Sequence, residues 1–438
     1  MTHLLLHPGV RIDDMRAAAF KRPLLSLPEG EELLLPVCSA KERGTAQVIS
    51  KGERVRRFEP LARDGDGLPL CYAPTAGTVD GCVAKDIPGR GKMICVRLIP
   101  GSGEHAARTL SRPSRTEATP QKILRAAGLL RLDDETDGEP LQEKLERYRS
   151  EEIDTLVCDA LCDDPFMADG LCALTEMTEE VCDGLQLAAK ACGCGRMLIA
   201  VFRAQAAGFG AVQRLKSSLD GCELLNINGK YPVWPALKRL RRFADQKLGR
   251  IGVQACLQLS RAVRLGRPAE RCVITVSGDG VQKPQNLSVL IGTPVSEVLA
   301  HTALSEEDDI AAVVVHGAFA GHAVADLETP VLADTRCVLA MTRRAGRRKS
   351  GCIGCGRCNE VCGENVFVSE AGRAVRRGRP EEALLYGAER CIGCRACDVV
   401  CPGGTNPSEL VLGTLPPKAK RLVFSEKKAC ERNGGNHD

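Results

Sequence analysis

The chain has 438 residues, 44% of them hydrophobic, which is enough for about three domains with real cores. A net charge of only +4 and 3% aromatic residues exclude a protein that binds nucleic acid by stacking its bases. The 23 cysteines follow a start without the basic and apolar regions of a secretory leader, so we expect reduced thiols in the cytoplasm of an anaerobe. The longest apolar stretch, 310–327, is interrupted by His316, His322 and Asp326. Because these polar residues break the stretch, we expect no transmembrane segment.

The first part of the chain predicts short strands punctuated by proline and glycine. We assign residues 1–100 to a β-rich domain. The paired segments 51–62 and 73–81 resemble the β-sandwich hammerhead of lipoyl and biotinyl proteins, without the lysine-bearing turn of that family. A linker rich in Ser, Thr, Arg and Pro follows at 101–120.

The middle of the chain, residues 121–265, alternates apolar runs with segments of helical periodicity. Such alternation predicts an α/β domain with a parallel sheet. The predicted strands are 153–159, 196–202 and 222–227, and the predicted helices are 178–192, 209–219 and 248–265.

Residues 266–335 predict a compact mixed module. It has strands within 271–281 and 311–321 and a helix at 291–299. A charged tail occupies 413–438.

Eight cysteines in two runs of the pattern C-x2-C-x2-C-x3-C mark the remaining segment, 336–412. This is the spacing of a bacterial two-cluster ferredoxin, in which the fourth cysteine of each run binds the other cluster. Structural zinc favours paired C-x2-C knuckles and does not explain the third cysteine. The sequence therefore predicts two [4Fe–4S] clusters with crossed ligands. One set is Cys352, Cys355, Cys358 and Cys401, and the other is Cys391, Cys394, Cys397 and Cys362.

The chain resembles the RnfC-like family, which includes a component of the Rnf electron-transport complex and soluble relatives such as the electron-transfer protein associated with proline reductase. The resemblance rests on the hammerhead-like segment, on I-D-T-L-V at 153–157, on the stretch 275–299 and on the two cysteine runs. It implies an N-terminal hammerhead, a central α/β domain, a β-grasp module of the SLBB type and a C-terminal ferredoxin-like domain. It also implies electron exchange with NADH through a flavin.

Three loops depart from that family. Its glycine-rich flavin and nucleotide loop is replaced at 124–141 by a segment with four acidic residues, where a phosphate would meet negative charge. Two further patches, at 158–166 and 316–321, are eroded as well. These departures argue against FMN and NADH. The four acidic residues are Asp133, Asp134, Glu135 and Asp137.

Two other groups of residues have open interpretations. Six cysteines between 158 and 194 either hold a third metal or redox dithiol, or serve as small buried side chains, and we favour the second. The basic runs 343–349 and 373–379 flank the first cysteine run, and 343–349 favours docking of an acidic redox protein, whereas 238–243 is more typical of a solvated surface. The six cysteines are Cys158, Cys162, Cys172, Cys182, Cys192 and Cys194.

Three functions remain open. We favour a relay of single electrons to or from a partner redox protein (a reductase, ferredoxin or flavodoxin), with peripheral docking on a membrane complex as an option. The alternatives are an NADH-dependent flavoenzyme and a non-redox assembly protein with structural clusters. No catalytic residue is assigned.

Overall fold

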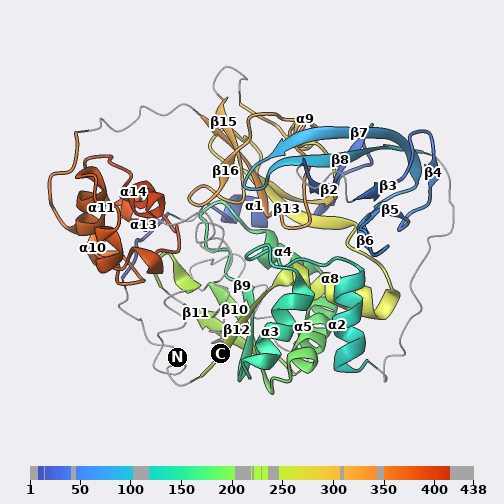
Figure 1. Cartoon of the computed structure of the whole chain (residues 1–438), viewed down its shortest axis with the longest axis horizontal. Helices are drawn as coiled ribbons and strands as arrows, with labels where there is room; N and C mark the ends of the chain where they lie inside the picture. Colours follow the sequence, from blue (N-terminus) through green and yellow to red (C-terminus); the bar gives the residue numbers. More distant parts are fainter. Residues whose placement is uncertain are drawn as a thin grey trace, which may run out of the picture. The chain divides into compact units, whose positions relative to one another are not determined.

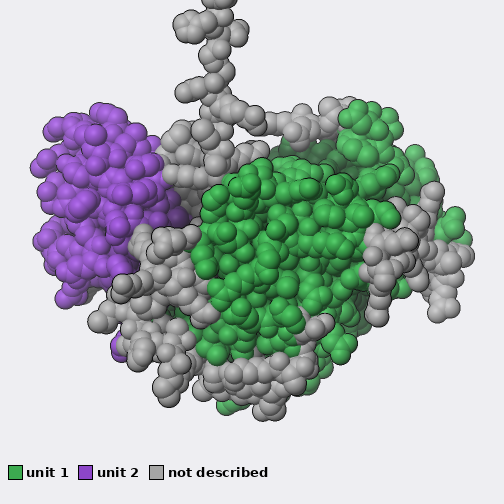
Figure 2. Space-filling model, turned by 90° about the horizontal axis from the view of Figure 1, so that it is seen from below, with its two compact units in different colours: residues 1–6, 12–229, 237–345 green, residues 7–11, 230–236, 346–438 purple. Residues whose placement is uncertain are grey.

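The computed structural model describes residues 8–13, 15–40, 46–101, 118–202, 219, 221–227, 229–234, 246–305, 310–342 and 350–414. The chain divides into two compact units (Figure 2). The larger unit comprises residues 1–6, 12–229 and 237–345, and the smaller one comprises 7–11, 230–236 and 346–438. All but the last residue of the predicted helix at 209–219 lies outside the described residues, as do the basic runs 238–243 and 343–349.

The N-terminal region of the larger unit forms two antiparallel sheets. One has the order β2-β8-β7-β4 and the other β3-β5-β6. Alternate residues of strands from both sheets, such as Leu33, Leu61 and Val96, are buried in one shared hydrophobic core, which is what holds two facing sheets together. The strands are β2 (Leu33–Ser39), β3 (Gln47–Val48), β4 (Arg54–Val55), β5 (Pro60–Arg63), β6 (Pro69–Tyr72), β7 (Gly77–Ile87) and β8 (Gly91–Pro100).

The central region is a four-stranded parallel sheet of order β11-β10-β9-β12, packed against helices (Figure 1). All six residues of β9 are buried, as expected for a strand covered on both faces. The strands are β9 (Thr155–Ala160), β10 (Arg196–Phe202), β11 (Glu223–Ile227) and β12 (Leu248–Gly252). The helices are α2 (Pro120–Leu129), α3 (Leu141–Ser150), α4 (Asp169–Glu176), α5 (Thr178–Cys192) and α8 (Val253–Leu265).

Local sequence explains where these helices begin and end. Thr119 caps α2 by accepting a hydrogen bond from the backbone N–H of Lys122. Pro120 occupies the first turn, where a backbone N–H has no acceptor within the helix, so the lack of one in proline costs no hydrogen bond. Gly193 ends α5 in the left-handed conformation, with φ of 79°. One prediction is wrong: 248–265 is not a single helix, because the five residues of β12 form a strand before α8.

A mixed six-stranded sheet of order β1-β14-β13-β17-β15-β16 completes the larger unit. Its central pair, β13 and β17, is parallel, and β17 lies beyond residue 335, where we expected the mixed module to end. The short strand β1 joins this sheet through β14 rather than the sheets of the N-terminal region. The elements are β1 (Leu25–Ser26), β13 (Arg271–Ser277), β14 (Gln285–Leu290), α9 (Val295–Ala300), β15 (Ile310–Val315), β16 (His322–Ala323) and β17 (Cys337–Thr342), with the short helix α1 (Ala17–Phe20) before β1.

The smaller unit consists of short helices around two cysteine loops, with a small core of its own. The prediction of an α/β protein with several sheets and a cysteine-rich C-terminal part is confirmed. None of the described helices is long and apolar enough to cross a membrane. The elements of this unit are α10 (Arg357–Glu360), α11 (Val368–Arg376), α12 (Glu382–Leu385), the 3-10 helix η5 (Ala388–Arg390), α13 (Ala396–Val399) and α14 (Pro407–Gly413).

Candidate metal centres

The eight cysteines of the two runs line two separate cavities in the smaller unit. Each cavity receives three thiols from one run and the fourth thiol from the other run. The first is lined by Cys352, Cys355, Cys358 and Cys401, and the second by Cys391, Cys394, Cys397 and Cys362.

The two loops turn in the same way because glycine or a left-handed residue stands at matching positions. Gly354 and Gly393 both have φ near 70°, and Gly356 of the first loop (φ 73°) corresponds to Arg395 of the second (φ 58°). Only glycine, which has no Cβ atom, adopts this conformation freely, so Arg395 is held there by its surroundings. In each run two thiols lie on the loop, the third lies in the short helix that follows it, and the fourth lies just beyond that helix.

A side chain next to the third cysteine of each run fixes the loop to the following helix. Asn359 accepts a hydrogen bond from the backbone N–H of Ser369 at the start of α11, at 2.8 Å. Asp398 accepts the equivalent bond from Ser408 at the start of α14, also at 2.8 Å, and its other oxygen accepts from the Ser408 hydroxyl. Both side chains therefore act as helix caps. The sequence pattern did not single out these residues, although each directly follows a cysteine of a repeated motif.

The environment of the thiols differs between the cavities. Cys352 and Cys355 are exposed, whereas Cys397 is buried. Burial raises the pKa of Cys391 to about 11 and also raises the pKa of Cys397. These two groups are therefore neutral thiols near pH 7 unless a metal cation displaces the proton, as it does in thiolate ligation.

The two fourth cysteines have local partners of different kinds. Burial acts to raise the pKa of Cys401, but hydrogen bonds from the Thr405 hydroxyl and nearby backbone N–H groups lower it overall. The sulfur of Cys362, which Gly363 follows where Pro402 follows Cys401, accepts a hydrogen bond from the backbone N–H of Val366 at 3.4 Å. Hydrogen bonds to sulfur favour the thiolate that a metal requires.

The donor set of each cavity fits an iron–sulfur cube, because four thiols are available and each iron of the cube takes one of them. Among the described residues, no group of three or more His, Cys, Asp or Glu side chains is arranged to hold a single metal ion.

A segment far away in the sequence completes the second cavity. The Tyr231 hydroxyl donates a hydrogen bond to the carbonyl oxygen of Cys394 at 2.7 Å, and Pro232 lines the cavity. Val10 pairs with Tyr231 through two backbone hydrogen bonds of 2.9 Å. Nothing in the local sequence of this segment, K-Y-P-V-W-P at 230–235, indicates its contact with the cysteine loop.

The basic run 373–379 has two different positions in the structure. Arg376 lines the first cavity together with Arg357, and no acidic residue lines that cavity. Arg379 instead pairs with Glu382 at 2.8 Å on the protein surface.

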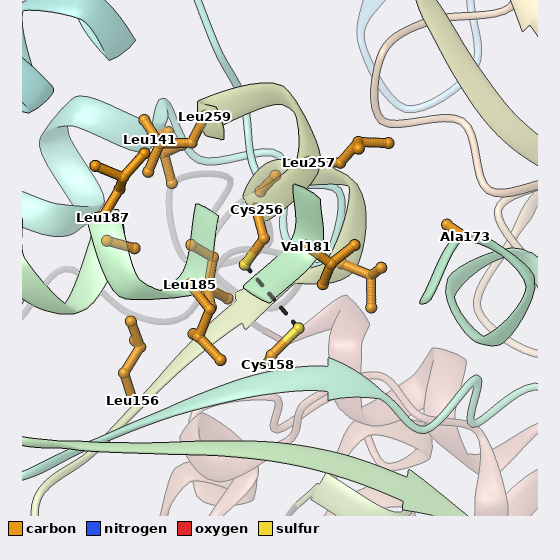
Figure 3. Close-up of a cluster of buried hydrophobic side chains, with 14 of the residues drawn as sticks. Leu141, Leu156, Cys158, Ala173, Val181, Leu185, Leu187, Cys256, Leu257 and Leu259 are labelled. Carbon is orange, nitrogen blue, oxygen red and sulfur yellow. Dashed lines mark hydrogen bonds between the residues drawn. The ribbon is translucent and has the colours of Figure 1, made fainter. Parts of the chain in front are cut away.

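The cysteines of the α/β region lie mostly in its hydrophobic core. Cys158 of β9 and Cys256 of α8 have their sulfur atoms 4.0 Å apart among buried leucines (Figure 3). A hydrogen bond with Cys256 and burial raise the pKa of Cys158, so its thiol stays protonated near pH 7 and is a poor nucleophile. This placement agrees with the interpretation of these cysteines as small buried side chains.

The acidic segment predicted at the flavin and nucleotide loop is folded inward. Asp134 and Glu135 are buried and accept hydrogen bonds from backbone N–H groups around the start of α8. Within this segment the backbone N–H groups of Asp134, Thr136 and Gly138 donate to acceptors of the segment itself. The described residues therefore do not fit a flavin or nicotinamide phosphate at this loop.

The cysteine-lined cavities indicate an iron–sulfur protein, and comparison with known proteins agrees. Residues 351–405 match the family model described as a 4Fe-4S dicluster domain. The chain thus carries a [4Fe–4S] domain toward its C-terminal end.

Over most of its length the chain is similar to the RnfC component of ion-translocating oxidoreductase complexes, which confirms the RnfC-like resemblance. It is 25% identical to the component from Edwardsiella ictaluri over 375 residues, covering 81% of this chain and 46% of the relative. It is 22% identical over 376 residues to the corresponding component of the proton-translocating ferredoxin:NAD(+) oxidoreductase complex of Clostridium ljungdahlii, covering 81% and 80%.

The chain thus spans about half the length of the Edwardsiella relative. Among solved structures it is similar to a chain of an NAD+-reducing [NiFe]-hydrogenase in the H2-reduced state, with a TM-score of 0.46 and 15% identity, covering 68% of this chain and 63% of that chain. A likeness at this level carries no functional conclusion.

Proposed function

We propose that this chain is an RnfC-like electron-transfer protein that relays single electrons through two [4Fe–4S] clusters to or from a partner redox protein. The observation that carries the proposal is the composition of the two cavities. Each contains four thiols, and each takes its fourth thiol from the other run.

The ligands follow from that composition. A [4Fe–4S] cluster supplies one-electron chemistry when bound, and its potential depends on burial and on hydrogen bonds to the sulfurs. The chain contributes the thiolates, excludes water around the buried Cys397 and donates N–H groups to Cys362 and Cys401. Cys352, Cys355, Cys358 and Cys401 hold one cluster, and Cys391, Cys394, Cys397 and Cys362 hold the other.

The remaining architecture is proposed with the same family in mind. The two antiparallel sheets of residues 33–100 support a hammerhead-like domain. The hairpin of β13 and β14, the helix α9 and the central parallel pair of β13 and β17 support a β-grasp module. The proposed ranges are 1–100 and 121–265, then a β-grasp module from 266 that runs to Thr342 at the end of β17 instead of to 335, and a cluster domain that follows it to 412 in place of 336–412, with a linker at 101–120 and a tail at 413–438.

The partner and the compartment are part of the same proposal. We propose a reducing cytoplasm as the compartment, because the cysteines that hold [4Fe–4S] clusters must be reduced. The two arginines at the first cavity support a reductase, ferredoxin or flavodoxin with an acidic face as the partner. The names of the relatives, which are components of oxidoreductase complexes, support peripheral docking on a membrane complex as a further option.

Pairs of cysteine substitutions test the crossed ligand sets. Cys352→Ala alone is expected to leave about four of about eight irons per chain, because one cube is lost. Adding Cys401→Ala should remove no further iron, since both residues serve the same cube. Adding Cys362→Ala instead should remove most of what remains. Iron and acid-labile sulfide are measured on anaerobically purified protein.

Cys82→Ala is the matched control, because Cys82 is an exposed thiol outside both cavities. It should retain the full iron content. The reverse pattern, in which the Cys362 variant is the silent partner of Cys352, would show that each run builds its own cluster. Wild-type protein that is colourless or contains zinc would overturn the proposed function as a whole.

A further inference from the structure

The start of α8 is a place where a parallel α/β sheet commonly receives a phosphate. The helix begins directly after β12, so its first backbone N–H groups lie at the carboxyl end of a parallel strand. Here the chain's own side chains accept these bonds. Glu135 accepts from Gln254 at 2.7 Å and from Ala255 at 2.9 Å, and Asp134 accepts from Gly252 at 3.2 Å.

The two acidic side chains accept the hydrogen bonds at the start of α8, and they also occupy the space in front of it. Asp134 is fully buried and Glu135 is 8% exposed. A Cβ atom added to Gly252 would lie 2.1 Å from the Glu135 carboxyl carbon, so the carboxyl group rests directly on the turn. An external anion would have to displace Glu135 to reach these N–H groups.

Ion pairs hold the acidic loop in this position. The fully buried Lys144 of α3 contacts Asp134 at 2.9 Å and Asp137 at 2.6 Å. At the end of the neighbouring strand, Asp159 accepts a hydrogen bond of 2.7 Å from Arg250 of β12. Asp134, Asp137 and Asp159 are therefore paired with cations within the chain.

A second carboxyl group accepts hydrogen bonds from another set of backbone N–H groups in the same way. Asp164 accepts from Ala318 at 2.6 Å and from Phe319 at 3.2 Å, and it is 6% exposed. A Cβ on Gly317, which has φ of 117°, would come within 2.8 Å of Asp164. The segments 158–166 and 316–321, which depart independently from the flavin-binding family, thus contact each other.

We infer that Glu135 with Asp134, and separately Asp164, occupy from within the chain the backbone sites that a phosphate-bearing cofactor would need at these two places. The larger unit keeps a parallel sheet of the kind that binds nucleotides. At these two places, however, the backbone N–H groups already donate to carboxyl groups of the chain itself. A flavin or nicotinamide phosphate does not bind at either place.

This closure of the two backbone sites by internal carboxyl groups has a consequence for the partners of the relay. The consequence rests on the proposed function. A hydride donor delivers two electrons together, whereas each [4Fe–4S] cluster accepts one. Without a flavin to separate the pair, the chain receives single electrons from one redox protein and passes single electrons to another. Any hydride chemistry belongs to a separate flavoprotein.

Substitution of the internal carboxyl groups tests the closure directly. Glu135→Ala is expected to lower the midpoint of thermal unfolding by about 1–8 °C, because the first N–H groups of α8 lose their acceptor. Sodium formate should restore part of this loss in the variant, compared with sodium chloride at equal ionic strength, and should leave the wild type unchanged. Asp164→Ala should behave in the same way.

The control is Glu139→Ala, since Glu139 lies in the same loop but pairs with Arg147 at 2.7 Å instead of the helix start. It should show no formate effect. If Glu135→Ala does not fold, Glu135→Gln, which retains one acceptor oxygen, should show a smaller loss of stability.

Three outcomes would overturn the inference: no difference between formate and chloride in the Ala variants, stoichiometric FMN on wild-type protein, or bleaching of wild-type clusters by NADH alone. None of these concerns iron content or reduction by dithionite. Failure of the closure is thereby distinguished from failure of the relay.

Discussion

At the scale of single residues, the cysteine loops depend on side chains that ligate nothing. Asn359 and Asp398 stand at equivalent places, and each caps the helix that follows its loop. One site uses an amide and the other a carboxylate for the same hydrogen bond. The shared requirement is therefore an acceptor oxygen at this position, and the negative charge of Asp398 is dispensable for it.

Substitutions of Asp398 test this requirement. Asp398→Asn should retain the iron content of the wild type, because Asn359 already performs the same role in the first loop. Asp398→Ala should lose the cap, at a cost of about 0.5–2 kcal/mol, and release iron from the second cluster faster under a chelator. The rate of iron release to a chelator measures both variants. Equal rates for the Ala variant and the wild type would contradict the role assigned to the cap.

At the scale of elements, the loop from 131 to 141 concentrates buried acidic groups between α2 and α3. Burial raises the pKa of Asp133 and of Asp137 to about 6. Burial and the nearby charge of Asp134 raise the pKa of Glu135 to about 8. The folded loop therefore binds protons at pH values where the unfolded chain, with carboxyl pKa values near 4, has released them.

The sign of the resulting pH dependence follows from these directions. Because the folded state holds more protons between about pH 4 and pH 8, the stability contributed by these groups falls as the pH rises through that window. Glu135→Gln removes the group that titrates at the upper end. Urea unfolding at pH 5 to 8 should show the variant gaining stability relative to the wild type as the pH rises. A difference that stays constant with pH would contradict the raised pKa of Glu135.

At the scale of the whole molecule, the chain joins a unit with two four-cysteine cavities to a larger α/β unit, in which Glu135 and Asp164 accept hydrogen bonds from backbone N–H groups at two loops. The smaller unit is itself built from three parts of the sequence, since 7–11 and 230–236 belong to it together with 346–438. Within the segment 230–236, the side chain of Tyr231 bonds to a cysteine loop. The cluster unit is therefore continuous with the chain of the larger unit at more than one place.

Redox titration of the intact chain tests the relay. Dithionite should deliver about two electrons per chain, one to each cluster, and produce the low-temperature EPR signal of interacting reduced clusters. NADH without an added flavoprotein should deliver none. Clusters that dithionite cannot reduce would instead support an assembly protein with structural clusters.

The sequence by itself determined the features that depend on short-range pattern. The strands β9 and β10, the helix α5 and the two cysteine loops follow from apolar periodicity and ligand spacing, because neighbouring residues fix them. The same local pattern misjudged 248–252, where a buried position beside β9 makes a strand of residues that continue into a helical run. Pairing in the sheet overrode local preference there.

Only the tertiary structure decided which distant groups meet. The cysteine pattern predicted how the eight thiols divide between two sites, but nothing in the pattern placed Tyr231 against Cys394. The acidic residues at 133–137 indicated a changed loop, yet only folding showed that Glu135 lies on the start of α8, which is 119 residues later in the chain at Gln254. Hydrogen bonds between segments far apart in sequence leave no periodic signal, because each needs only one donor and one acceptor brought together by the packing of everything between them.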